Sequence, residues 1–379
     1  MRRILALPVL LVAVALLAGC ASPTTAGDPT STDDTCAHAA DPLTSLALAD
    51  DVRAATGRAT ACLAGHGIDP VDDTSEPSLP VTVTDAEGRD VRITDVSRIL
   101  PVDISGTIAS TVFALGLGDR VVGRDASTDF DGTRELPVVT SSGHTLAAEA
   151  ILEIAPTVML TDTTIGPKEV REQLRAAGIA VVVISSERRL DTTDDLITEI
   201  AGALGVPSRG AALVERVDAD IHDAVAEIAA VAPADAAQRA RMLFLYVRGS
   251  ANVYYIFGAD SGADSLIDSV GGVDVATEIG WEGMKPLTAE ALVAAQPDVL
   301  VMMTDGLASV GGVAGLVERL PALAQTPAGR NQRVIDMADT EILSFGPRSA
   351  DIIRALARAL YAPADSPAPD DPGAAGTTS

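Results

Sequence analysis

The feature that most constrains the fold is a repeat shared by the two halves of the chain. LAAEAILEIAPTVML begins at Leu146, LTAEALVAAQPDVLV begins at Leu287, and the two segments align without gaps. A helix, a Pro turn and a strand that recur in this way predict two lobes of similar design. Each copy places one carboxylate in the first helical turn, Glu149 or Glu290. Good helix chemistry explains both carboxylates, because they complement the helix dipole, and this is compatible with a functional role.

Strands and helices alternate in both halves, which predicts an α/β fold of two Rossmann-like lobes with mainly parallel sheets. After a hairpin over 81–94, the expected strands are 98–100, 121–122, 136–140, 158–160, 180–184, 242–248, 252–257, 299–303 and 333–336. The expected helices are 104–117, 146–154, 168–177, 193–204, 208–230, 265–270, 288–295 and 348–361. The helix over 208–230 runs for about six turns. It predicts a single connecting helix, 206–234, between an N-terminal lobe, 81–205, and a C-terminal lobe, 235–362.

The segment MLFLYVRG, residues 242–249, is typical of a strand that is covered by helices on both faces. Because side chains alternate along a strand, Phe244, Tyr246 and Arg248 share one face. Tyr246 and Arg248 lie near the carboxyl end of the strand, where open α/β sheets place their ligand crevices. An Arg buried there for stability alone would be unusual.

The first twenty residues indicate export. Arg2 and Arg3 precede an apolar run that ends in Leu-Ala-Gly-Cys at Cys20, and the run is too short for a spanning helix of ~20 residues. The ending resembles a bacterial lipobox, in which the Cys thiol receives lipid, including palmitate, after residues 1–19 are removed. The alternative is an ordinary signal peptide with a chance Cys. Lipidation predicts a protein tethered to the outer face of the cell membrane.

A lipidated Cys20 leaves Cys36 and Cys62 as the two remaining thiols of an exported chain, so a disulfide between them is the natural expectation. Two separate thiols are the alternative. We interpret 20–80 as a lipid-anchored tether that contains a disulfide-clipped helical segment over 43–64. Residues 363–379 are rich in Ala, Pro, Asp and Gly and are expected to be a disordered tail.

Composition excludes several classes of function. A formal charge of -26 argues against direct binding to nucleic acid or anionic lipid. The chain has no P-loop, no G-x-S-x-G elbow, no H-E-x-x-H and no Cys pair with zinc spacing, so nothing in the sequence indicates an enzyme.

The placement of His144 distinguishes it from the other three histidines. His38 and His66 lie in the N-terminal segment, and His222 lies within the connecting helix. His144 follows a strand end in the loop SSGH, so it occupies in one lobe the place that Tyr246 occupies in the other. In isolation such a His is more often an exposed loop residue.

An imidazole and a phenol on opposite walls of a cleft would suit an iron held in a flat macrocycle, because its two axial positions lie on opposite faces. A free phenol has a pKa of about 10. Arg248, two residues from Tyr246 on the same strand face, would favour the phenolate. A plain core tyrosine with Arg248 at the rim is the alternative that spacing leaves open.

Several long segments together resemble the substrate-binding lipoproteins of iron-complex ABC importers, and in particular the actinobacterial haemin-uptake proteins. The resemblance covers 81–361. The segments that carry it are RILPVDISGTIASTVFALGLGDRVVGRD, SSGHTLAAEAILEIAPTVMLTD, MLFLYVRGSANVYYIFGADSGADSLIDSVGG, EIGWEGMKPLTAEALVAAQPDVLVMMT and the SFGPR loop.

This resemblance implies a class III substrate-binding protein, monomeric, that holds ferric haem between His144 and Tyr246. It implies that Arg248 hydrogen-bonds the tyrosine oxygen and that Arg348 of the SFGPR loop meets a propionate. It further implies that Glu149 and Glu290 dock onto the permease, which works with an ATPase in the membrane. The segment from Cys36 to Cys62 lies outside the common core of the family.

A single connecting helix predicts small lobe motion and a largely preformed cleft. The same importer role with a siderophore or a corrinoid as cargo is the first alternative. An extracellular enzyme that acts on haem or on the cell wall is a more remote one.

Overall fold

One sheet of seven strands forms the C-terminal lobe, with β9 near its centre. The computed structural model describes residues 36–141 and 143–365. The strand order is β1-β14-β13-β9-β10-β12, and β11 pairs with the start of β9. Strands β1, β14, β13 and β9 are parallel, whereas β10 and β12 are antiparallel to their neighbours. The bounds are β1 Arg58–Ala61, β9 Arg241–Arg248, β10 Val253–Phe257, β11 Val273–Asp274, β12 Met284–Pro286, β13 Val299–Met303 and β14 Val334–Met337.

The N-terminal lobe is built on a smaller parallel sheet in the order β4-β7-β8. The expected hairpin over 81–94 is confirmed as β2 and β3, and a short pair, β5 and β6, precedes the repeated helix. Residues 121–122 and 136–139 make only isolated bridges rather than the full strands expected. The bounds are β2 Val81–Thr84, β3 Asp90–Ile93, β4 Ile99–Val102, β5 Thr140–Ser141, β6 Thr145–Leu146, β7 Val158–Thr161 and β8 Ala180–Val183.

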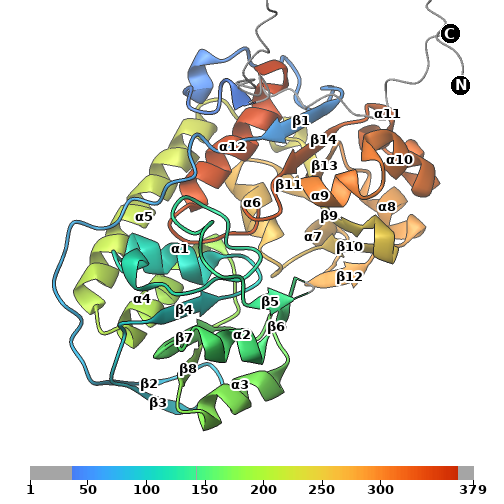
Figure 1. Cartoon of the computed structure of the whole chain (residues 1–379). Coiled ribbons are helices and arrows are strands. Elements are labelled where there is room, and N and C mark those ends of the chain that lie inside the picture. The colour runs from blue at the N-terminus through green and yellow to red at the C-terminus, as the bar shows by residue number, and fades with distance from the viewer. Residues whose placement is uncertain (1–35, 142, 366–379) are drawn as a thin grey trace, which may run out of the picture. The chain divides into compact units, whose positions relative to one another are not determined.

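Helices cover the sheets of both lobes (Figure 1). The N-terminal lobe contains α1 Thr107–Ala114, α2 Ala148–Glu153, α3 Lys168–Ala176 and α4 Thr193–Ala203. The C-terminal lobe contains α6 Ala263–Ser269, α7 Val275–Glu278, α8 Ala289–Ala295, α9 Thr304–Ala308, α10 Gly312–Arg319, α11 Pro327–Arg330 and α12 Ser349–Tyr361. The sequence pattern did not predict α7, α9, α10 or α11. Two of these, α7 and α11, are single turns of four residues, too short to show a helical period.

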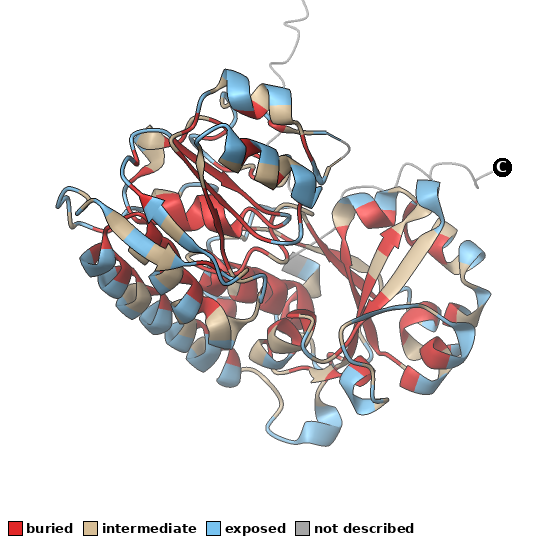
Figure 2. Ribbon diagram, turned by 90° about the horizontal axis from the view of Figure 1, so that it is seen from below, coloured by how far each residue is buried: buried red, intermediate tan, exposed pale blue. Residues whose placement is uncertain are grey.

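Strand β9 is buried on both faces, as its sequence predicts. Phe244 packs in the hydrophobic cluster that contains α12, and Tyr246 packs against the same cluster. The other face carries Leu243, Leu245 and Val247, which belong to a separate cluster beneath α8 and α10. Buried residues accordingly fill the strands and the inward faces of the helices (Figure 2).

The lobes are joined by α5 (Pro207–Ala229), which confirms the single long connecting helix. It packs against α4 of the N-terminal lobe and against α12 of the C-terminal lobe. Pro207 occupies the first helical turn, where a missing N–H costs nothing. The connecting element therefore lies in contact with both lobes along its length.

The helical segment expected over 43–64 is wrong. Leu43–Ser45 forms one 3-10 turn, and Arg58–Ala61 forms β1, an edge strand that pairs in parallel with β14. Leu43, Val52 and Ala59 are buried in the core of the C-terminal lobe, so this part of the chain is no loose tether. The side chains of β1 alternate between buried and half-buried positions because β1 lies at an edge of the sheet.

Residues 36–80, here called the N-terminal strap, connect the two lobes a second time. After β1 the strap leaves the C-terminal lobe, and the backbone N–H of Val71 donates to Ala114 O of α1 at 2.8 Å. Arg216 and Ser208 of α5 bond to strap residues 69–73 on the way. Figure 1 shows this course from β1 down to β2.

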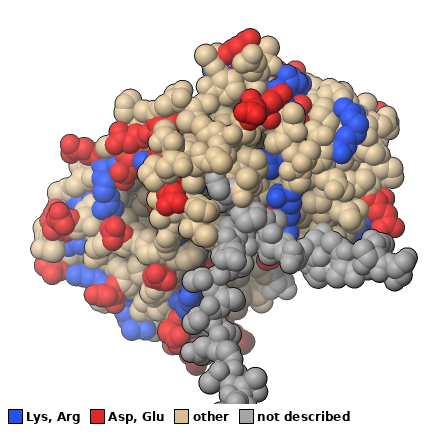
Figure 3. Space-filling view, turned by 90° about the horizontal axis from the view of Figure 1, so that it is seen from above, with Lys and Arg blue, Asp and Glu red and all other residues tan. Residues whose placement is uncertain are grey.

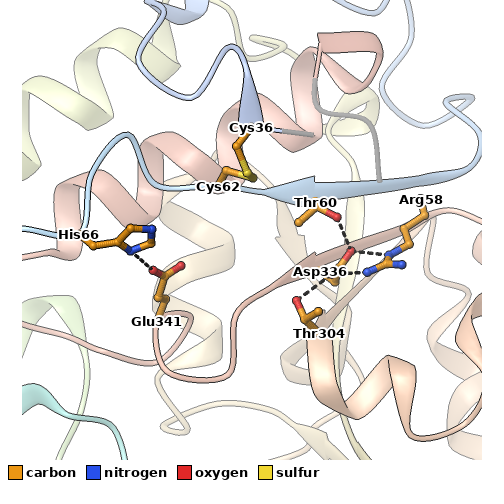
Figure 4. The surroundings of a disulfide bond; sticks show 8 residues. All are labelled: Cys36, Arg58, Thr60, Cys62, His66, Thr304, Asp336 and Glu341. Carbon is orange, nitrogen blue, oxygen red and sulfur yellow. Dashed lines mark hydrogen bonds and ion pairs between the residues drawn. A yellow bond between two sulfur atoms is a disulfide. The ribbon is translucent and has the colours of Figure 1, made fainter. Parts of the chain in front are cut away.

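A disulfide and a buried ion pair fasten the start of the strap (Figure 4). Cys36 and Cys62 are bonded, which is the pairing that the export signal suggested. Arg58 donates two hydrogen bonds of 2.7 Å to Asp336, which is fully buried and also accepts from Thr60 and Thr304. The disulfide thus closes the first part of the strap into a covalent loop, and the ion pair joins β1 of the strap to β14 of the sheet.

The repeat seen in the sequence is a repeat in the structure. Glu149 lies in the first turn of α2 and Glu290 in the first turn of α8, and both are exposed. Each helix is followed by a residue of positive φ immediately before a proline, Ala155 at 43° and Gln296 at 44°. The two lobes therefore share this backbone conformation, although the residues that adopt it differ, Ala in one lobe and Gln in the other.

Several expectations fall on residues that the structure does not describe: the signal peptide, Cys20 and the tail beyond residue 365. None of the helices in the described ranges has the length and hydrophobicity needed to cross a membrane. On the face seen in Figure 3, acidic and basic side chains are interspersed.

Candidate functional site

Tyr246 and Arg248 lie together at the carboxyl end of β9. The Tyr246 ring stacks near Phe257 of β10, with 5.9 Å between ring centroids. The guanidinium carbon of Arg248 lies 4.5 Å from the centroid of the Tyr246 ring, within the range of a cation–π contact. Strand alternation predicted this shared face.

The guanidinium of Arg248 is oriented by neighbours other than the phenol oxygen. It donates to Asp339 Oδ2 at 2.7 Å and to the Val247 carbonyl at 3.0 Å. The expected hydrogen bond to the Tyr246 oxygen is absent among the described residues; the cation stacks on the ring instead. The side chain keeps 34% exposure, so it holds a positive charge at a solvent-accessible edge of the site.

His144 is the predicted site residue of the N-terminal lobe. It lies in the turn between β5 and β6, beside Gly143, whose φ of +81° favours glycine. The His144 carbonyl accepts from Gly166 N at 3.1 Å, which fixes the turn. Partial burial, and then the charge of Arg248, lower the pKa of His144. Arg248 belongs to the other lobe, so its charge acts on His144 across the two lobes.

An apolar platform extends from Tyr246 toward the edge of the sheet. Register places Tyr255 directly opposite Tyr246 and Phe257 opposite Phe244, and it places Met284 of β12 opposite Phe257. Met284 is exposed by 55%. The sequence pattern does not predict this platform. The alternation in 253–257 is visible, but β12 has only three residues, and its pairing with β10 has no local signal in the sequence.

A cavity of about 800 Å³ lies between the lobes, and residues from both of them line it. Its N-terminal wall is formed by 104–105, 186–189 and 191–192, and its C-terminal wall by 260–261, Leu343 and Phe345. His144 and Tyr246 are not part of its lining. Beside the cavity, Arg189 donates to Asp264 at 2.7 Å and to Asp260 at 3.3 Å, which joins the lobes by ion pairs.

Arg188 organises the floor of the N-terminal wall. It contacts the carboxylates of Asp103 and Asp162, which are fully buried at the carboxyl ends of β4 and β7. Burial and the nearby charge of Asp103 raise the pKa of Asp125, a third buried carboxyl, to about 7. Asp103 also accepts from the N–H groups of Thr107 and Ile108 at the start of α1. These groups fix the loops of the cleft rather than present a free charge to it.

Arg348 lies at the start of α12, beside the strap. It is only 5% exposed and donates to the buried Glu341 at 3.3 Å, while His66 of the strap contacts the same carboxylate at 3.2 Å. The propionate contact that the resemblance implies for Arg348 stays a prediction.

The donor set at the site is compatible with an axially held iron. No cluster of three or more His, Cys, Asp or Glu residues able to hold a bare metal ion is found in the described ranges. One imidazole and one phenol on opposite lobes instead offer two ligands, which is what an iron with four macrocycle nitrogens still requires.

Comparison with known proteins yields a consistent group of relatives. The family model described as "Periplasmic binding protein" matches residues 102–340, more than half of the chain. A crystal structure of heme binding protein HmuT is 43% identical, covers 82% of this chain and 99% of its own, and has a TM-score of 0.77. Three other matched structures are variants of that protein in which an arginine, a tyrosine or a histidine is replaced by alanine.

More distant relatives extend the same group. The periplasmic heme-binding protein RhuT from Roseiflexus sp. RS-1, in apo form, is 36% identical with a TM-score of 0.63, and the match covers 71% of this chain and 100% of RhuT. The periplasmic heme-binding protein BhuT, in complex with two hemes, is 34% identical with a TM-score of 0.61, with coverage of 69% and 97%. No curated protein matches the chain.

Proposed function

The chain belongs to the periplasmic binding protein family, and from this premise we propose that it captures ferric haem for an ABC importer. The observation that supports the proposal is the contact of Arg248 with the Tyr246 ring at the end of β9, together with the effect of burial and then of the Arg248 charge on the pKa of His144 in the other lobe. The cargo is haem, held as transported ligand and not chemically changed. The family comprises transport proteins, and we propose no catalytic activity.

Each residue has a defined task in this proposal. Tyr246 supplies an oxygen ligand, and Arg248 stacks on its ring. His144 supplies a nitrogen ligand, and its lowered pKa keeps the imidazole neutral, as metal ligation requires. The platform of Tyr255, Phe257 and Met284 offers apolar surface to the porphyrin, whose large faces favour burial.

The exposed carboxylates of the two repeated helices suit a partner rather than the cargo. Glu149 and Glu290 lie in equivalent first turns, so they present one negative charge from each lobe. We assign them to docking on basic residues of the permease. The protein acts as a monomer tethered through lipidated Cys20 to the outer face of the cell membrane, where the permease and its ATPase lie.

Haemin titration of the purified chain tests the cargo. We expect a Soret band and charge-transfer bands of six-coordinate ferric haem that saturate at a defined ratio. Tyr246→Phe and His144→Ala should each change these bands, because each removes one axial ligand. Tyr254→Phe is the matched control, since Tyr254 packs on the opposite face of the sheet.

Unchanged spectra in both ligand variants would refute the ligand assignment. Parallel titrations with a ferric siderophore and with a corrinoid test whether the protein has the same importer role with a different cargo. Tight binding of either one without any haemin spectrum would replace haem as the cargo.

A Glu149→Gln, Glu290→Gln double variant tests the permease contact. We expect it to bind haemin normally, since neither side chain is a proposed ligand, and to lose most haemin uptake. Single variants should lie between the double variant and the wild type. Normal uptake by the double variant would exclude the docking role.

A further inference from the structure

The carboxyl-terminal end of α2 is held by one guanidinium. Arg98, immediately before β4, donates from Nε to Ala155 O at 3.0 Å and from an Nη atom to Ile154 O at 2.6 Å. The last carbonyls of a helix have no partner within the helix, so these bonds satisfy groups that would otherwise face solvent. A cation at this end is also favoured by the helix dipole.

The same arrangement recurs at α8. Arg241, the first residue of β9, donates to Ala295 O at 3.1 Å, at the end of that helix. Arg98 and Arg241 thus occupy equivalent places, at the entry of the first parallel strand of their respective lobes. The 15-residue sequence repeat contains neither arginine, so the similarity is independent of it.

Further hydrogen bonds complete the match. In the N-terminal lobe, Thr157 N donates to Arg98 O at 2.9 Å, and Arg98 N donates to the Thr157 hydroxyl at 3.2 Å. In the C-terminal lobe, Asp298 N donates to Arg241 O at 2.7 Å, and Arg241 N donates to the Asp298 carboxylate at 3.1 Å. Each lobe therefore has one arginine bracket, which we define as the arginine, the end of its short helix and the residue after the Pro turn.

Both helices are short, and each carries its exposed Glu at the end opposite to the bracket. A helix of six or seven residues is about 10 Å long, so a change of angle at its carboxyl end moves the amino end by a comparable arc. Arg98 is exposed and Arg241 is half-buried, so neither contributes a large buried area to the fold. Each guanidinium bonds the end of its helix, and that of Arg241 also forms an ion pair of 2.7 Å with Glu278 of α7.

We propose that Arg98 and Arg241 are positioning residues that set the spacing and direction of Glu149 and Glu290 for the permease. This inference rests on the proposed docking function. It assigns a role to two arginines that touch neither the haem ligands nor the partner.

The test measures ATP hydrolysis by liposomes that contain the permease and ATPase, with increasing concentrations of the haemin-loaded protein. The Arg98→Gln, Arg241→Gln double variant should raise the half-saturating concentration about tenfold, since three charged hydrogen bonds are lost. The maximal rate and the haemin spectrum should stay unchanged. Lysine at both positions should restore part of the affinity, because one ammonium can bond one carbonyl.

Arg92→Gln is the matched control, because it removes one positive charge from an exposed position of β3 and should change nothing. Amide hydrogen exchange of the isolated protein gives a second readout: Arg98→Gln should accelerate exchange in α2 but not in α8, and Arg241→Gln the reverse.

A half-saturating concentration equal to that of the wild type, with unchanged exchange, would overturn the inference. Suppose that the arginine double variant behaves like the wild type in this way. If the Glu149→Gln, Glu290→Gln double variant nevertheless loses its ATPase stimulation in the same assay, only the positioning role fails. If that variant stimulates normally, the docking role and the inference fail together.

Discussion

Arg248 interacts with two of the predicted site residues. Its guanidinium stacks on the Tyr246 ring, and its charge, after partial burial, contributes to the lowered pKa of His144 on the other lobe. A positive neighbour disfavours the protonated imidazole. Asp339 fixes the guanidinium by a 2.7 Å ion pair without removing it from solvent.

Replacing Arg248 by Ala should raise the pKa of His144 toward its ordinary value near 6.5. The reason is that a positive neighbour penalises the protonated ring, and partial burial alone remains after the change. Titration of the His144 ring protons by NMR in the ligand-free protein measures the shift. Arg92→Ala should leave it unchanged, and a His144 pKa that stays constant in the Arg248 variant would show that the two lobes do not interact there.

The direction of the His144 shift also fixes a pH dependence for haem binding. A lowered pKa keeps the imidazole neutral to lower pH, so the affinity for haemin should be constant above about 6.5 and fall as the solution is acidified through the pKa of His144. The His144→Ala variant should lack this acidic fall. A fall of equal size in that variant would assign the pH dependence to another group.

Residue patterns predicted the positions of Tyr246 and Arg248 on β9 better than the surroundings of the candidate site. Strand alternation alone placed Tyr246 beside Arg248, because the period of two is a local property of the chain. The ion pair of Arg348 with Glu341 could not be seen in this way. The turns and loop between the two residues have no sequence period.

At the scale of elements, the strap is the part that the sequence described least well. Strand β1 has four residues, RATA, with little apolar character, and its partner β14 lies more than 270 residues away in the sequence. Pairing over such a distance leaves no local signal. The long helices and the buried strands were predicted well because their periods extend over many residues.

Removing the disulfide should destabilise the strap without affecting the site. For the 26-residue separation of Cys36 and Cys62, loss of the loop constraint should lower the free energy of unfolding by about 3 kcal/mol. Chemical denaturation of a Cys36→Ser, Cys62→Ser variant measures this change, and the haemin spectrum should be preserved. Equal stability of variant and wild type would show that the hydrogen bonds and ion pairs of the strap suffice to hold it.

For the whole molecule, three connections act against wide opening of the lobes. The helix α5 packs on both lobes, the strap crosses between them, and Arg189 joins them by ion pairs to Asp260 and Asp264. A hinge of flexible strands would allow much larger rotation. The cleft should therefore be largely formed before haem arrives.

Solution scattering should show this limited motion. We expect the radius of gyration of the ligand-free and haemin-loaded protein to agree to about 1 Å, as for other preorganised binding proteins. Arg189→Ala should enlarge the difference, because it removes one of the three connections. A decrease of several ångströms on loading of the wild-type protein would instead indicate hinge closure.

The central claim is that residues from opposite lobes bind one iron, and a crystal structure of the haemin-loaded protein measures it most directly. The account predicts an iron within bonding distance of both the His144 imidazole nitrogen and the Tyr246 oxygen, with Arg248 beside the phenolate. An iron that is bound by one lobe alone, or that lies elsewhere, would contradict it.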